Sequence, residues 1–369
     1  MIPVAKPSLD KQEQQAVLDV IKSGMIASGQ AVTDFEIAFA KLFNYKHVIA
    51  CSSGTAALHA ALIAHDIGQG DEVITTPFSF IATANTILAT GAIPVFVDID
   101  RETFNLDPNL IESKITSKTK AIMPVHLYGH SADNTLINQI AKKHKLLVIE
   151  DACQAHGAIY PSFGKSKYVG SQNTASFSLY PTKNMTSAEG GLIVTSNNKI
   201  AEKVRQFINH GQSRRYVHTT FGLNYRMTNL HAAIGLEQTK KLPDFTAKRQ
   251  RNAKYLIKKL TSLQLIKLPV TKPGYTHVYH QFTIRIPEQH RDKIAEKLNQ
   301  AGIGTGIHYP ISIPKQPYYK KLGFGNEKYS QSENAAREVL SLPIHPLVSL
   351  KDLDYIAETL ITAVKQTTV

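Results

Sequence analysis

Seven short runs of β-favouring apolar residues alternate with helical segments over residues 48 to 195, and this alternation leaves few folds open to the chain. The runs cover residues 48–51, 72–76, 93–98, 120–125, 146–150, 174–179 and 191–195. Strands separated by helices form mainly parallel sheets whose two faces are both buried. The last two runs are joined by a loop alone, so we expect an antiparallel or crossover pairing there. The pattern predicts an α/β domain with a mainly parallel seven-stranded sheet and helices on both faces.

Two helices are expected before the first of these runs. Residues 8–24 place apolar side chains on one face, with Ser8 positioned as a cap at the start and Gly24 at the end. A second helix is predicted over residues 34–43.

A different order of elements follows residue 245. The pattern predicts a basic helix to about 260, a strand at 279–286, a helix at 289–301, a short strand at 303–309, and helices at 332–340 and 351–365. The proline-containing segment 268–274 is expected to be a loop. We therefore predict a large α/β domain over residues 1–245 and a smaller C-terminal α+β domain over residues 246–369.

Composition favours a soluble cytoplasmic protein. A chain of 369 residues that is 43% hydrophobic is long enough and apolar enough for two domains. It has no apolar run of membrane-spanning length, and its N-terminus lacks the order of a signal peptide. The two cysteines, Cys51 and Cys153, are far apart and lack the spacing of a disulfide framework or a metal site, which fits a reducing compartment.

The net charge of +13 points to an anionic small substrate more than to nucleic acid. Basic residues are spread along the chain, with a modest cluster from Lys240 to Lys259 that we interpret as the solvated face of a helix. The sequence has no zinc-ligand spacing, no Gly-rich RNA motif and no basic arm beside heptads. Nucleic-acid binding is therefore a distant second interpretation.

The segment Cys51–Leu58 combines a strand end, a turn of small residues and a helix start. Free backbone N–H groups at that helix start, with the hydroxyls of Ser53 and Thr55, form a cup suited to a phosphate. An ordinary helix cap has the same residues, because Ser and Thr are common caps. Taken alone, this motif favours the ordinary cap.

A second candidate segment, residues 148–157, is an apolar strand that ends in Glu150 and Asp151. Open α/β sheets bind ligands at the carboxyl edge, where this pair would lie. Asp151 is surrounded by apolar or small residues, so its charge needs a buried cation or hydrogen bonds. A helix cap after a strand is the alternative role for Asp151, and His156 is expected to be structural or a hydrogen-bonding neighbour.

The loop over residues 176–191 holds Lys183 among small and hydroxyl residues, five positions after Ser178. A solvated lysine usually lies on a helix face among polar partners. A lysine in a small-residue loop at a sheet edge can instead be desolvated, lose its proton and attack a carbonyl.

A phosphate cup, an acid at a strand end and a loop lysine together match the demands of pyridoxal phosphate (PLP). This cofactor needs anion binding for its phosphate, a carboxylate that keeps its pyridine nitrogen protonated, and an amine that forms a Schiff base. The three features in this order are far less expected by chance than any one of them.

Several longer motifs, spread over nearly the whole chain, resemble the motifs of a single protein family. They are Ser-Ser-Gly-Thr-Ala-Ala-Leu at 52–58, Glu-Asp-Ala-Cys-Gln-Ala-His-Gly at 150–157, Tyr-Pro-Thr-Lys-Asn-Met at 180–185 followed by Glu-Gly-Gly at 189–191, Leu-Asn-Tyr-Arg-Met at 223–227, Gly-Ile-His-Tyr-Pro at 306–310 and Leu-Ser-Leu-Pro at 340–343. Together they resemble the DegT/StrS family of PLP-dependent nucleotide-sugar aminotransferases. The resemblance implies PLP-transferase fold type I and a homodimer whose active sites are shared across the interface.

The same resemblance assigns roles to individual residues. Lys183 would form the Schiff base, and Asp151 would partner the pyridine nitrogen. The other cofactor-binding residues that it implies are Gly54, Thr55 and Ser178 at the phosphate, Phe80 stacked on the ring, Gln154 near the phenolic oxygen, and Asn224 at the phosphate of the neighbouring subunit's cofactor. His308 and Tyr309 would border the sugar.

The activity implied is a ping-pong transamination. An amino acid donor, expected to be L-glutamate, gives its amino group to the cofactor, which passes it to a keto group of a nucleotide-linked sugar for amino-sugar and surface polysaccharide biosynthesis. Two positions depart from the family's pattern: Phe80 stands where tryptophan or tyrosine is often found, and Ala188 stands where glycine is common.

Other functions stay open from the sequence. A PLP enzyme acting on a non-sugar carbonyl has the same cofactor residues. Sugar dehydratases in this family carry histidine in place of the lysine, and Lys183 argues against them. A non-catalytic regulator with the same fold is a further alternative, against which an intact Lys183 and Asp151 argue.

Overall fold

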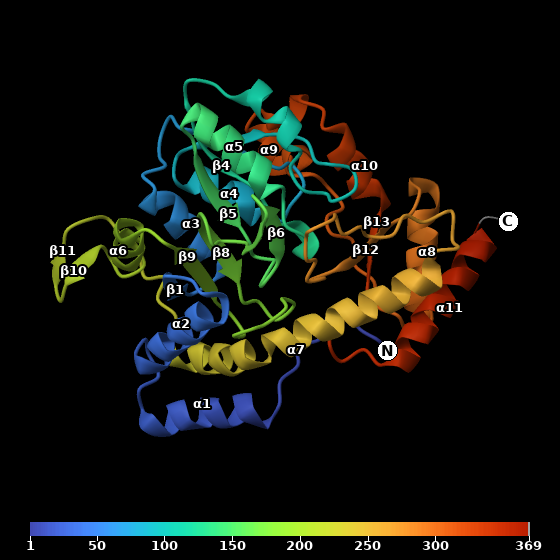
Figure 1. The fold of residues 1–369 in the computed structure, drawn as a ribbon, viewed down its shortest axis with the longest axis horizontal. Coiled ribbons are helices and arrows are strands. Elements are labelled where there is room, and N and C mark those ends of the chain that lie inside the picture. The colour runs from blue at the N-terminus through green and yellow to red at the C-terminus, as the bar shows by residue number, and fades with distance from the viewer. Residues whose placement is uncertain (368–369) are drawn as a thin grey trace.

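The computed structural model describes residues 1–367 and has a mainly parallel sheet at its centre (Figure 1). Within the described chain, seven strands form this sheet in the order β1-β9-β8-β5-β4-β2-β3. They are β1 (His47–Cys51), β2 (Glu72–Thr75), β3 (Ile93–Phe96), β4 (Thr119–Met123), β5 (Leu147–Asp151), β8 (Thr174–Ser178) and β9 (Gly191–Thr195). Each strand coincides with one of the runs predicted from the sequence, so the predicted α/β architecture is confirmed.

Strand β9 makes one end of the sheet antiparallel and leaves the rest parallel. It runs antiparallel to both of its neighbours, β1 and β8, whereas the remaining pairs are parallel. A loop alone joins β8 to β9, so the expected antiparallel pairing is confirmed. Strands β8 and β9 are buried along their whole length, which explains why their sequences are continuous apolar and small-residue runs rather than alternating ones.

Helices cover both faces of the sheet. One face packs against α3 (Gly54–Ala64), α4 (Ala82–Ala89) and α6 (Asn198–Phe207). The other packs against α2 (Gln30–Phe43), α5 (Asn134–His144) and the long α7 (Asn229–Leu260). The three-layer arrangement buries both faces of the sheet. The carboxyl ends of the parallel strands remain accessible, and we call this side of the sheet its open edge.

A second hydrophobic core lies at the far end of α7. It is built on β12 (Phe282–Arg285) paired antiparallel with β13 (Val339–Leu342), and on α8 (Glu288–Gln300) and α11 (Leu350–Thr367). Figure 1 shows α7 running beneath the sheet and onward to α8 and α11. The predicted domain boundary after residue 245 falls inside this continuous helix, and the division into two domains remains a prediction.

Shorter elements connect and decorate the two cores. They are the hairpins β6 (Ile159–Ser162)–β7 (Lys165–Tyr168) and β10 (Gln212–Arg214)–β11 (Val217–His218), the helices α9 (Pro317–Lys321) and α10 (Ser330–Glu338), and the 3-10 turns η1 (Pro108–Leu110), η2 (Glu112–Lys114), η3 (Leu127–Gly129), η4 (Ile313–Lys315) and η5 (Phe324–Asn326). The hairpin β10–β11 extends away from the body of the molecule (Figure 1). No helix within residues 1–367 has both the length and the apolar character needed to cross a membrane.

Three local predictions were wrong. Helix α1 (Lys11–Ser23) is capped by Asp10 rather than Ser8, because Asp10 and Glu13 form a reciprocal capping box. The helix predicted over 332–340 ends at Glu338, since the apolar residues that follow pair as β13. In the described chain, the strand expected over 303–309 is reduced to single bridges, such as Gly306 with Ser341.

The contact between α2 and α7 depends on a glycine. Phe35 of α2 is fully buried, and a Cβ built on Gly235 of α7 would lie only 2.8 Å from the Phe35 ring. Glycine is a poor helix former, so its place inside α7 is explained by close helix packing rather than by propensity.

We predict that Gly235→Ala lowers the free energy of unfolding by about 1–2 kcal/mol. Overpacking a core costs about 1–3 kcal/mol, and the better helix propensity of alanine offsets up to about 1 kcal/mol of that cost. Urea denaturation measures the change. The matched control is Ala247→Gly on the exposed side of α7, which should lower stability by about 1 kcal/mol through propensity alone. A Gly235→Ala protein that is more stable than the parent would contradict the packing explanation.

Candidate active site

A cavity of about 450 Å³ lies at the open edge of the sheet. It lies between the carboxyl ends of β5 and β8, the start of α3, and residues of the smaller core. The predicted site residues that line it are Gly54, Thr55, Phe80, Asp151, Gln154, Ser178, Lys183, His308 and Tyr309. The structure therefore brings together residues that are up to 255 positions apart in the sequence.

The start of α3 offers free backbone N–H groups to the cavity. Ser53 caps the helix by accepting a hydrogen bond from Ala56 N at 3.1 Å, so the ordinary cap exists. No described residue accepts a hydrogen bond from the Gly54 or Thr55 amides, which remain free for an anion. A Cβ on Gly54 would lie 2.7 Å from Ser178 Cβ, so glycine is needed for the end of β8 to approach the helix.

Lys183 lies in the loop between β8 and β9 and is partly buried. Burial lowers the pKa of its amine, and the nearby Cys153 and Asp151 oppose this effect only in part. A larger share of the amine is therefore uncharged at neutral pH than in a solvated lysine. Later in the same loop, Ala188 has a φ of +67°, so this non-glycine residue adopts the left-handed backbone that glycine would take at lower cost.

Asp151 is buried at the end of β5, with 4% of its surface exposed. Its carboxylate accepts hydrogen bonds from Thr83 Oγ1 at 2.8 Å and from Cys153 N at 3.2 Å. Thr83 is linked in turn to Ser79, at 2.9 Å between hydroxyl oxygens. Neutral donors thus stabilise the carboxylate, and among the described residues no lysine or arginine forms an ion pair with it.

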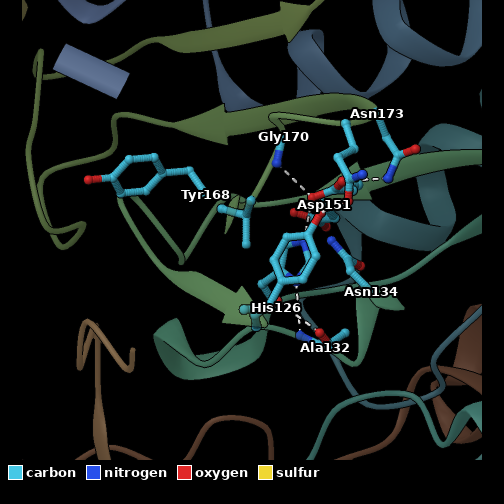
Figure 2. Close-up of polar contacts among 12 residues, drawn as sticks. His126, Ala132, Asn134, Asp151, Tyr168, Gly170 and Asn173 are labelled. Carbon is cyan, nitrogen blue, oxygen red and sulfur yellow. Dashed lines mark hydrogen bonds and ion pairs between the residues drawn. The ribbon is translucent and has the colours of Figure 1, made fainter. Parts of the chain in front are cut away.

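Glu150, the residue before Asp151, forms a separate buried network, and Figure 2 labels its partners His126, Gly170 and Asn173. Its carboxylate accepts hydrogen bonds from His126 Nε2 at 2.9 Å, Gly170 N at 2.8 Å and Asn173 Nδ2 at 2.8 Å. Burial alone raises the pKa of this carboxyl, but these hydrogen bonds outweigh burial and bring the pKa below its usual value. Glu150 is therefore a buried, fully hydrogen-bonded anion.

The opposite wall of the cavity is a chain of polar contacts. Gln154 Nε2 donates to Tyr309 Oη at 3.1 Å, and its Oε1 accepts from Tyr128 N at 2.8 Å. The Tyr128 hydroxyl donates to the His308 carbonyl. Phe80 is 56% exposed and its ring centroid lies 6.1 Å from that of Tyr309, so a broad face remains open to a planar ligand.

Two predicted residues lie outside this lining. Asn224 is exposed, in the segment that follows the β10–β11 hairpin, and does not line the cavity of its own chain. His156 is completely buried, and its ring centroid lies 5.2 Å from that of Phe177. Burial and the charge of Lys183 lower the pKa of His156 to about 3, so its ring is neutral.

Sequence reasoning missed two residues at this site, Thr83 and His280, and the buried network of Glu150 beside it. Thr83, which supports Asp151, lies on α4 and has no motif that marks it. Glu150 is the first of the two acids that the sequence places at the strand end, but its network could not be predicted because its partners are 20 to 24 residues away along the chain. His280 lines the cavity from the turn that precedes β12.

Comparison with known proteins gives a consistent result. Residues 7–361 match the model of the DegT/DnrJ/EryC1/StrS aminotransferase family. A protein of Geobacillus stearothermophilus named pleiotropic regulatory protein is 42% identical over 353 residues, which cover 94% of this chain and 93% of the relative.

Two solved structures share the fold over nearly the whole chain. NtdA from Bacillus subtilis with bound cofactor PMP is 37% identical, with a TM-score of 0.89 over 97% of this chain and 83% of its own. Helicobacter pylori PseC, an aminotransferase involved in the biosynthesis of pseudoaminic acid, is 29% identical, with a TM-score of 0.92 over 99% of both chains.

We predict that Glu150→Gln lowers the free energy of unfolding by about 1.5–3 kcal/mol at neutral pH, because the amide turns an N–H group toward donors that the carboxylate accepted from. The folded-state pKa of Glu150 is below its ordinary value of 4.5. Its contribution to stability is therefore complete above that value and is lost as the pH falls through the lower, folded pKa. Urea denaturation of parent and variant as a function of pH measures the difference.

The control is Asp66→Asn, which removes an exposed ion pair with Lys203 and should change stability little. A stability difference between parent and Glu150→Gln that grows as the pH falls below 4 would refute the buried-anion assignment.

Proposed function

The chain belongs to the DegT/DnrJ/EryC1/StrS aminotransferase family, and on that premise we propose a specific reaction for it. It is a PLP-dependent aminotransferase that moves an amino group from L-glutamate to a keto group of a nucleotide-linked sugar, in the cytoplasm, for amino-sugar and surface polysaccharide biosynthesis. The observation on which this proposal rests is the meeting of Lys183, Asp151 and the start of α3 in one cavity. The sugar is supported by the likeness to PseC, which acts in the biosynthesis of pseudoaminic acid.

The residues of the cavity fit PLP. The free Gly54 and Thr55 amides and the Ser178 hydroxyl form a site of the right chemistry for its phosphate. The buried carboxylate of Asp151 has only neutral hydrogen-bond donors among the described residues, so a protonated pyridine nitrogen would give it a cationic partner. Phe80 offers an exposed aromatic face for the ring.

Bound PLP would supply an electron-accepting ring that stabilises negative charge at the carbon bearing the amino group. Asp151 would hold the proton on the pyridine nitrogen, because a buried carboxylate favours the protonated form of a neighbouring base. The amine of Lys183 would accept the proton that leaves the α-carbon of the donor, a task that needs an uncharged amine. Burial lowers the pKa of Lys183 below that of a solvated lysine, which favours the uncharged form.

A homodimer with shared sites is part of the proposal. Asn224 lies outside the cavity of its own chain, and the same exposed region includes the large apolar side chains Tyr216 and Phe221. A second copy of the chain would cover them and place its own Asn224 toward the phosphate end of this cavity. Such an arrangement supports the role that the family resemblance implies for Asn224.

A regulatory function is the second candidate, because the 42% identical relative is named a pleiotropic regulatory protein. A regulator would use the cavity as a sensor and bind PLP without turnover. The presence of both Lys183 and Asp151 in the cavity favours the enzyme. Incubation with L-glutamate and a panel of nucleotide-linked keto sugars and 2-oxo acids separates the two functions, and it also separates a sugar acceptor from a non-sugar carbonyl.

We predict that Lys183→Ala slows the half-reaction with L-glutamate by at least about 10²–10⁴-fold, the range that a positioned general acid–base contributes. The half-reaction is monitored in PLP-loaded protein through the change in cofactor absorption as PLP is converted to pyridoxamine phosphate (PMP). Lys165→Ala is the matched control, because Lys165 is an exposed lysine of the β6–β7 hairpin. Unchanged turnover in the Lys183→Ala protein would exclude the proposed mechanism.

A further inference from the structure

The turn at Tyr279–Gln281, just before β12, presents two polar side chains to the cavity. His280 is 6% exposed, lines the cavity and has no hydrogen-bond partner at Nδ1 among the described residues. Gln281 lines the same cavity, and its Oε1 has no described partner either. A buried polar atom left without a hydrogen bond costs about 1–3 kcal/mol, so its persistence beside a cavity indicates a group that a ligand satisfies.

The backbone of this turn is held in a strained conformation. Tyr279 has a φ of +45°, and its ring stacks on His277 with 3.9 Å between ring centroids and an angle of 4°. Gly129 packs so closely that a Cβ there would lie 2.9 Å from His280 N. Strained backbone persists where the surrounding structure fixes it, and such sites cluster at ligand pockets.

Arg249 of α7 holds the turn in place through hydrogen bonds to its main chain. It is 4% exposed, although it lies in the middle of the basic cluster Lys240–Lys259 that was expected to be a solvated face. Its Nη1 donates to the carbonyl oxygens of Tyr279 at 3.0 Å and His280 at 3.2 Å. A buried guanidinium with two main-chain carbonyls as partners restricts the direction in which the His280 side chain leaves the backbone.

The protonation state of His280 determines which ligand groups it can bind. Burial, with the positive charges of Lys183 and Arg249, keeps the pKa of His280 well below its usual value, so the ring is neutral. A neutral imidazole has one donor and one acceptor nitrogen, which matches a hydroxyl group. A carboxylate is bound best by cations, and Lys183 is the one lysine or arginine among the described residues that line the cavity.

We propose that His280 is a substrate-binding residue that hydrogen-bonds a hydroxyl or carbonyl oxygen of the acceptor sugar, with Arg249 as its positioning residue. This inference rests on the proposed function and adds a specific contact to it. His280 acts in the half-reaction with the sugar and takes no part in recognising the α-carboxylate of the amino acid donor.

The test separates the two half-reactions of the PLP-loaded and PMP-loaded protein. His280→Leu removes both hydrogen-bonding nitrogens at similar volume, and His280→Asn retains a donor and an acceptor. The first half-reaction uses L-glutamate, and the second uses UDP-linked and dTDP-linked 4-keto-6-deoxyhexoses. We expect His280→Leu to lower kcat/KM for the sugar about tenfold or more, the effect of one lost hydrogen bond, and to leave the glutamate half-reaction within twofold. His280→Asn should recover part of the loss.

A binding measurement gives a readout that does not depend on turnover. Calorimetric titration compares UDP-glucose with UDP, and dTDP-glucose with dTDP, on the parent and the His280→Leu protein. We expect the variant to lose the affinity that the sugar adds and to keep the affinity for the nucleotide. His345→Leu is the matched control, since His345 is also buried and also has an unpartnered Nδ1 among the described residues but does not line the cavity.

The results that would overturn the inference differ from those that would overturn the function. Two results would exclude the His280 contact and leave the proposed function standing, provided that the parent protein transaminates. In the first, His280→Leu has the same activity as the parent protein. In the second, His280→Leu loses both half-reactions equally. A folded parent protein that binds neither sugar nucleotide and does not react with glutamate would contradict both. Thermal unfolding of each variant tests whether it is folded at the assay temperature.

Discussion

Successive side chains of a β-strand point to opposite faces of the sheet, and at the end of β5 this rule places two acids back to back. Glu150 points toward the α5 face, where it is buried and accepts three hydrogen bonds from described residues. Asp151 points toward the α3 face and lines the cavity. Its main chain is fixed by hydrogen bonds to Pro124 O at 2.9 Å and from His126 N at 3.0 Å. The His126 side chain is also a partner of Glu150, so the position of the acid that faces the ligand depends on the burial of the acid beside it.

Burial also sets the protonation of the groups around the cavity. It lowers the pKa of Lys183, and with the charge of Lys183 it brings the pKa of His308 to about 4. The rings of His280 and His308 are therefore neutral, and the uncharged form of Lys183 is favoured relative to a solvated lysine. The carboxyl group of Asp151 accepts a hydrogen bond from Thr83, a neutral donor. Proton transfer on a PLP-bound substrate requires an amine that can accept a proton and a carboxyl group at the pyridine nitrogen, and Lys183 and Asp151 line one cavity.

Much of the fold could be predicted from the sequence, because the alternation of apolar runs with helical segments is a local signal. The seven predicted runs became the seven strands of the sheet within residues 1–367, and the start of α3 lies where the small-residue turn placed it. The errors arose where partners distant in the sequence decide the outcome. The helix predicted to reach residue 340 ends at Glu338, because residues 339–342 pair with β12, more than 50 residues earlier. Arg249 looks like part of a solvated face, yet the carbonyls that bury it belong to a turn 30 residues away. The support of Asp151 by Thr83 spans 68 residues and has no sequence pattern.

The central claim is that the amine of Lys183 forms the Schiff base with the cofactor, in the cavity that Asp151 also lines. Reduction of the PLP-loaded protein with borohydride converts a bond between the cofactor and a lysine into a stable one, and peptide mass spectrometry then locates the labelled residue. The structure predicts a single phosphopyridoxyl group on Lys183, and no label at that position in Lys183→Ala. A label on any other lysine of the parent protein, or a PLP-loaded protein with no label at all, would contradict the account.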